Sequence, residues 1–63
     1  IMTEYQNLPN DPAMLLSFVN TQLRDNYPSF SEFVAAFHAD ADAITEKLKM
    51  IDYEYDETQN QFV

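Results

Sequence analysis

Apolar residues recur at helical spacing through the first part of the chain. Asp11 followed by Pro12 is typical of a helix start, because aspartate caps free backbone amides and proline suits the first helical position. Pro28 disfavours helical geometry in the residue before it, so we expect a first helix from Asp11 to about Asn26. At 100° per residue, four side chains share a narrow stripe of this helix: Leu16, Val19, Leu23 and Tyr27.

The N-terminal half of this helix carries a second apolar sector. Met14, Leu15 and Phe18 lie outside the stripe that contains Leu16. A helix with one solvated side does not need two apolar sectors. We therefore expect that either the C-terminal part of this chain or another chain covers the second sector.

A second helix is predicted from Ser29. The segment Ser29 to Glu32 matches the capping box S-x-x-E, although Ser31 is a rival cap. The residues that follow at spacings i, i+3, i+4 and i+7 are apolar and indicate a buried face: Phe30, Phe33, Val34 and Phe37.

A third helix is predicted after a short connection from His38 to Asp40, with Asp40 as its cap. Its apolar face consists of Ala41, Ile44, Leu48 and Ile51. Its acidic residues come early and its two lysines late, as the helix dipole favours.

The last part of the chain is typical of a β-hairpin. Residues 53–56 alternate between tyrosine and acidic residues, residues 56–59 suit a turn, and residues 60–63 form the returning strand. The sequence has no glycine, so aspartate or asparagine must supply any positive φ angle in this turn.

These elements predict a mainly α fold of three short helices followed by a C-terminal β-hairpin, resembling a winged helix-turn-helix. Residues 1–10 form an N-terminal arm and residues 11–63 a single domain. The expected core consists of Leu15, Leu16, Val19, Leu23, Tyr27, Phe30, Phe33, Val34, Phe37, Ile44, Leu48, Ile51, Tyr53, Tyr55 and Phe62.

Composition and charge narrow the possible functions. The chain has 63 residues and no cysteine, which excludes a disulfide, a thiol nucleophile and a zinc–thiolate site. No apolar run approaches about 20 residues and no signal peptide is evident, so we expect a soluble, cytoplasmic protein. The formal charge of −8 opposes binding to nucleic acids and to anionic membranes.

The third helix is unsuited to DNA although the layout resembles a DNA-binding fold. It opens with Asp40, Asp42 and Glu46, which would face phosphate groups. Lys47 and Lys49 lie about 200° apart around the helix and cannot form one basic patch. We therefore expect no direct binding to nucleic acid.

No set of residues suggests a reaction. His38 is the only histidine, and the nearest serines serve better as helix caps than as nucleophiles. The densest acidic cluster, residues 52–57, lacks the glycine and terminal glutamate of an EF-hand loop. We expect no catalytic, cofactor-binding or metal-binding residues, and we expect that the protein is not an enzyme.

Four motifs along the chain resemble a small family of bacterial proteins known as domain of unknown function 4250. The motifs are LPNDP, MLLSFVN, LRDNYPS and YEYDETQNQF, and the resemblance extends from Leu8 to Phe62. It implies a bacterial origin and this domain length, but no functional residues. The family often has a cysteine in the second helix, where this chain has Val34 or a neighbour, and a glycine where Asp52 stands. Asp52 follows the third helix, where left-handed geometry is common and aspartate is tolerated.

The leading expectation is a non-enzymatic protein-interaction module that binds a protein partner or another copy of itself. Its expected partner-binding residues are Met14, Leu15, Phe18, Leu8 and Asn10. The LPNDP segment is either a recognition element or a hydrophobic staple with Leu8 or Tyr5 folded back. The alternative function is an acidic helix-turn-helix-like regulator that reaches nucleic acid through a basic partner.

Overall fold

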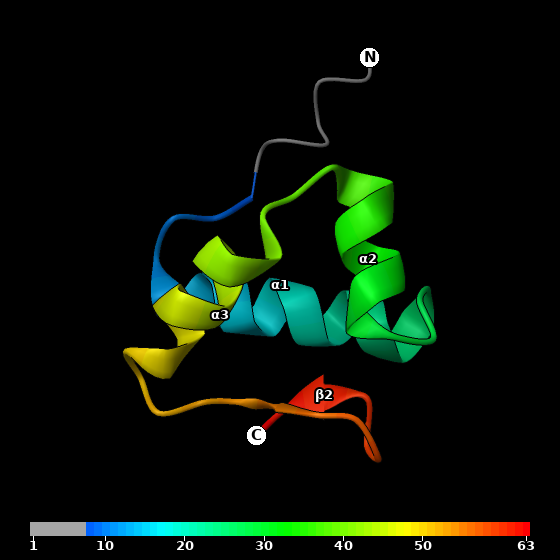
Figure 1. Ribbon diagram of the computed structural model, residues 1–63. Helices are drawn as coiled ribbons and strands as arrows, with labels where there is room; N and C mark the ends of the chain where they lie inside the picture. Colours follow the sequence, from blue (N-terminus) through cyan, green and yellow to red (C-terminus); the bar gives the residue numbers. More distant parts are fainter. Residues whose placement is uncertain (1–7) are drawn as a thin grey trace.

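The computed structural model describes residues 8–63 as three helices followed by a two-stranded antiparallel hairpin (Figure 1). This architecture confirms the predicted mainly α fold. Residues 1–7 of the predicted arm lie outside the described residues. The elements are α1 (Pro12–Asp25), α2 (Phe30–Phe37), α3 (Ala41–Lys49), β1 (Tyr55–Asp56) and β2 (Gln61–Phe62).

Each helix begins at the cap that the sequence predicts. The Asp11 carboxylate accepts a hydrogen bond from the Met14 amide at 3.1 Å. Ser29 Oγ accepts from the Glu32 amide at 3.2 Å, so Ser29 and not Ser31 caps α2. Asp40 Oδ1 accepts from two amides of α3, at 3.0 and 3.2 Å. These bonds satisfy backbone donors that a helix N-terminus leaves without partners.

Within residues 8–63, three residues have positive φ angles, and the chain contains no glycine. His38 and Asp52 adopt φ angles of 53° and 67° after α2 and α3, and Asn60 adopts 53° before β2. The left-handed geometry expected at Asp52 is confirmed. Asparagine and aspartate tolerate this geometry because their short polar side chains can bond the local backbone.

The two shorter helices lie side by side against α1. In Figure 1, α3 lies beside the N-terminal half of α1 and α2 beside its C-terminal half, while the hairpin crosses below them. Helix α1 contacts both helices and β2. The fully buried core lies between these elements and consists of Leu15, Val19, Leu23, Phe33, Ile44, Leu48 and Phe62.

The buried face of α1 differs by one position from the predicted stripe. Leu15 is 2% exposed and belongs to the core, whereas Leu16 is only half-buried. The reason is that α3 and β2 pack on the side of α1 that Leu15 shares with Val19 and Leu23. The other expected core residues are half-buried around this centre: Tyr27, Phe30, Val34, Phe37, Ile51, Tyr53 and Tyr55. A domain this small cannot enclose so many large side chains completely.

The hairpin is present but shorter than predicted. Tyr55 pairs with Phe62 and Asp56 with Gln61, and residues 57–60 form the turn. Backbone bonds between Glu54 and Val63, at 2.8 and 2.9 Å, extend the pairing by one residue. The Tyr53 amide instead donates to the Leu48 carbonyl at 3.0 Å, so this predicted strand residue closes the end of α3.

Candidate functional site

An uncharged apolar patch lies on the outer side of α1. It is a shallow depression lined by Pro9, Met14, Ser17, Phe18 and Thr21, which we call the α1 patch. The Met14 side chain is 63% exposed, although it is one of the larger apolar side chains of the molecule. Residues 14, 17, 18 and 21 share one helix face, so their spacing could have identified Ser17 and Thr21 as members of the patch.

Phe18 belongs both to this patch and to the aromatic core. Its ring meets Phe33 and Phe37 edge-on, with centroid distances of 6.3 and 5.7 Å. It is therefore half-buried against α2 and only partly available to a partner. Leu15 is 2% exposed and is not part of the α1 patch, so it offers almost no surface to a protein partner on that face. Met14, by contrast, remains largely exposed.

A second depression lies between the segment that precedes α1 and the start of α3. We call it the Pro9 hollow; its volume is about 270 Å³. Leu8, Asn10 and Leu15 line it, and Pro9 borders both this hollow and the α1 patch. The remaining lining residues are His38, Ala39, Asp40, Ala43, Ile44 and Lys47. The five predicted partner-binding residues therefore surround Pro9, a residue absent from the prediction.

Leu8 and Asp11 show what the LPNDP segment does structurally. Leu8 is half-buried and packs against the core cluster, while Asp11 caps α1. This arrangement agrees with the staple interpretation for Leu8. Tyr5, the other candidate for this role, lies outside the described residues.

Asn20 attaches β2 to α1. The Phe62 amide donates to Asn20 Oδ1 at 2.8 Å, and Asn20 Nδ2 donates to the Phe62 carbonyl at 3.1 Å. The side-chain amide thus pairs with the backbone as a neighbouring strand does. It satisfies both polar groups on the free edge of β2, which protects that edge from pairing with another chain.

Asn60 joins the hairpin to the connection between α1 and α2. Asn60 Nδ2 donates to the carbonyls of Leu23 and Tyr27 at 3.1 and 3.0 Å. Its Oδ1 accepts from the Tyr55 hydroxyl at 2.6 Å, and that hydroxyl accepts from the Phe30 amide at 3.2 Å. The polar atoms of Asn60 are therefore used by the fold and are not presented to a ligand.

The carboxylates with lowered pKa values also have local structural partners. The Arg24 guanidinium holds the pKa of Asp25 below its ordinary value through hydrogen bonds of 2.9 and 3.1 Å. Hydrogen bonds from Thr58 and Gln59 lower the pKa of Asp56 in the hairpin turn. All of these side chains are solvent-accessible, and hydrogen bonding to near neighbours explains the shifts without a catalytic role.

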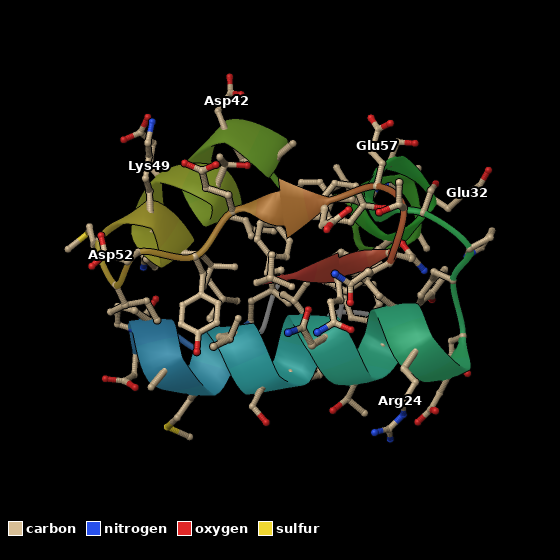
Figure 2. All side chains as sticks on the ribbon, turned by 90° about the horizontal axis from the view of Figure 1, so that it is seen from below. Arg24, Glu32, Asp42, Lys49, Asp52 and Glu57 are labelled. Carbon is tan, nitrogen blue, oxygen red and sulfur yellow. The ribbon has the colours of Figure 1, made fainter. Side chains whose placement is uncertain are left out.

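Most of the acidic residues belong to the part of the chain that follows α1. Residues 12–23 of α1 contain no charged side chain. Eight of the eleven acidic residues follow Pro28: Glu32, Asp40, Asp42, Glu46, Asp52, Glu54, Asp56 and Glu57. In Figure 2, Glu32, Asp42 and Glu57 lie on the side away from α1, whereas Arg24 projects from α1 in the opposite direction.

Residues 8–63 contain neither a metal-ligand cluster nor a membrane-spanning helix. In this part of the chain, no group of three or more histidine, cysteine, aspartate or glutamate residues is placed to hold a metal ion. Over the same residues, no helix combines the length and the apolar character needed to cross a membrane.

Comparison with known proteins gives one match. Neither the curated proteins nor the solved structures contain a match to this chain. A family model matches residues 9–62, from the hollow-lining Pro9 through the hairpin residue Phe62. The match includes the helices, the hairpin and the α1 patch, so the chain belongs to the family described as domain of unknown function (DUF4250).

Proposed function

We propose that this chain is a small protein-interaction module without catalytic activity, and that it binds a protein partner or a second copy through the α1 patch. The observation that carries the proposal is the 63% exposure of Met14 at an uncharged helix face. Methionine and aromatic side chains are enriched at protein interfaces. The unbranched methionine side chain also adapts to irregular partner surfaces.

The distribution of charge also favours the α1 patch as the contact surface. Two copies of a chain with formal charge −8 repel each other at long range. Contact across the α1 patch keeps the carboxylates of α3 and the hairpin apart, because the patch itself contains no charged residue. An acidic protein partner would likewise be repelled by these carboxylates and favour contact at the α1 patch. The proposal includes a bacterial cytoplasmic setting, which the cysteine-free sequence supports.

The two exposed methionines provide a matched test. Met14 and Met50 are 63% and 75% exposed, but only Met14 lies in the α1 patch. We expect Met14→Glu to weaken self-association or partner capture about tenfold or more, and Met50→Glu to change it less than about twofold. Size-exclusion chromatography with light scattering and an affinity pull-down measure the effect, and circular dichroism checks folding. Equal behaviour of both variants and the wild type contradicts the proposal.

A second candidate is a regulator that reaches nucleic acid through a basic partner. The exposed carboxylates of Asp42 and Glu46 on α3 favour a cationic partner on that side. By itself the chain should not retard duplex DNA even at low salt, where electrostatic binding is strongest. Retardation that appears only when a basic protein is added supports this candidate. A direct micromolar complex that weakens steeply with salt contradicts the interaction-module proposal.

A further inference from the structure

We propose that the Pro9 hollow binds a small amphipathic carboxylate, with the apolar part of the ligand against Leu15 and Ile44 and its carboxylate on the Lys47 ammonium. This site is separate from partner binding at the α1 patch. The proposal therefore stands or fails independently of the function proposed above.

The floor of the hollow is apolar and belongs to the buried core. Leu15 and Ile44 are 2% and 4% exposed and come from the facing helices α1 and α3. Leu8, Ala39 and Ala43 add apolar walls. The volume of about 270 Å³ is near the lower end for ligand sites, so it suits a molecule with a short hydrocarbon chain.

Lys47 is a half-buried cation that forms no ion pair with an acidic residue of the described part of the chain. Residues three and four positions away along α3 and just beyond it are all apolar: Ala43, Ile44, Met50 and Ile51. The ion pair found within residues 8–63 joins Arg24 to Asp25 and does not involve Lys47. The Lys47 stem can lie along the apolar wall while its ammonium stays at the rim of the hollow. Lys49, by contrast, lies three residues after Glu46 and does not line the hollow.

The position of Asp40 fixes the orientation of the ligand. Asp40 also lines the hollow, while its Oδ1 accepts from the Asp42 and Ala43 amides and the N-terminal end of α3 partly offsets its charge. Asp40 and Lys47 are seven residues apart, which corresponds to about 10 Å along the helix. A carboxylate is therefore favoured at the Lys47 end and disfavoured at the Asp40 end, where His38 and Asn10 complete the rim.

Three probes of equal chain length test the charge preference. Hexanoate, hexan-1-ol and hexylamine are titrated into the isotopically labelled protein and followed by amide NMR shifts. Moderate salt, at which the Debye length is about 8 Å, screens the long-range repulsion from the net negative charge. We expect saturable shifts around Ala43, Ile44 and Lys47 with hexanoate, and clearly weaker binding of the alcohol and the amine.

Matched variants assign the effect to Lys47. Lys47→Gln should weaken hexanoate binding about tenfold, whereas Lys49→Gln, with the same change of charge, should weaken it less than about twofold. Ala43→Phe places a large side chain at an exposed position on the wall and should block the hollow without unfolding the domain.

The contrary outcomes are equally specific. The proposal is overturned if hexan-1-ol binds as tightly as hexanoate, or if the two lysine variants behave alike. Shifts that map to the α1 patch, or no saturable shift with any probe, overturn it as well. None of these results bears on whether Met14 contacts a protein partner.

Discussion

The two halves of α1 face different surroundings. In the C-terminal half, the Asn20 side chain and the Leu23 carbonyl bond the hairpin, so their polar atoms have partners inside the molecule. In the N-terminal half, Met14 is largely exposed and Phe18 is only half-covered. In a domain this small, buried amides and hydroxyls form hydrogen bonds that hold the fold together. An exposed apolar side chain that the fold does not require is therefore more informative about function.

The four sequence segments that suggested the family divide in part along the same line. LRDNYPS and YEYDETQNQF contain Tyr27, Tyr55 and Asn60, which connect the hairpin to the two first helices. Their pattern is explained by the fold. LPNDP contains Pro9, which borders both the α1 patch and the Pro9 hollow. MLLSFVN contains Met14 of the α1 patch, although it ends in Asn20, which bonds β2. We infer that an activity shared by the family is more easily sought in the second pair of motifs.

The largest expected difference is between glutamate substitutions at Leu23 and Met14. Leu23→Glu places an unpaired carboxylate in the core, where the leucine is 2% exposed, and should unfold the domain at a cost above about 4 kcal/mol. Met14→Glu changes an exposed side chain and should alter the free energy of unfolding by less than about 0.5 kcal/mol. Urea titration followed by circular dichroism measures both. An unfolded Met14→Glu chain contradicts the division of α1.

Phe18→Glu gives an intermediate case. The sequence suggested a free interface residue, whose substitution leaves the helices intact. The contacts with Phe33 and Phe37 change that expectation to a loss of about 1–3 kcal/mol. Because stability and binding both change, Phe18 is a poorer probe of the interface than Met14.

The asparagines that attach the hairpin should have the next largest effects. Asn60→Ala removes three hydrogen bonds and leaves two carbonyls without their donor, so we expect a loss of about 2–4 kcal/mol. Asn20→Ala removes two bonds and should cost about 1.5–3 kcal/mol. Asn26→Ala is the control, since Asn26 is exposed and bonds only its helical neighbour Gln22 through its side chain. Thermal unfolding measures all three, and equal losses would disprove the special role of the hairpin contacts.

Features determined by near neighbours could be predicted from the sequence. The caps Asp11, Ser29 and Asp40 act on amides two or three residues away, so short motifs identify them. The left-handed geometry at Asp52 follows from its place after α3 in a chain that has no glycine. The hairpin follows from alternation, although its length depends on where the Tyr53 amide bonds.

Features determined by distant contacts could not be predicted from the sequence. The bonds between Asn20 and Phe62 join residues 42 positions apart, and nothing local indicates them. Leu15 and Leu16 are 100° apart on the helix, and only the placement of α3 and β2 decides which is buried. The Pro9 hollow likewise depends on how α3 meets the segment before α1. The apolar residues three and four positions from Lys47 along α3 are a signal that the sequence does contain.

Salt should stabilise the domain through its effect on the acidic residues. Screening relieves repulsion among the carboxylates of α3 and the hairpin, so moderate sodium chloride should raise the melting temperature by about 3–6 °C. Differential scanning calorimetry measures the shift. A shift that needs micromolar calcium and is not reproduced by sodium would instead identify a metal site in residues 52–57.

The smallest expected effect is the pH dependence that comes from Asp56 in the hairpin turn. Its pKa is lowered from the ordinary value of 3.8, so its contribution to stability is fully present well above that value. The contribution is lost as the pH falls through the lower pKa of the folded state. The difference in stability between the wild type and Asp56→Asn should therefore shrink below about pH 4.

Asp25 on α1 provides the comparison for this last effect. Its pKa is lowered by the exposed cation Arg24, whereas the donors to Asp56 are the neutral groups of Thr58 and Gln59. Salt screens an exposed ion pair more strongly than hydrogen bonds from neutral donors. In denaturant titrations at several pH values, the difference for Asp56→Asn should persist in high salt, and that for Asp25→Asn should decline. If salt abolishes both differences equally, the turn is held by charge and not by its hydrogen bonds.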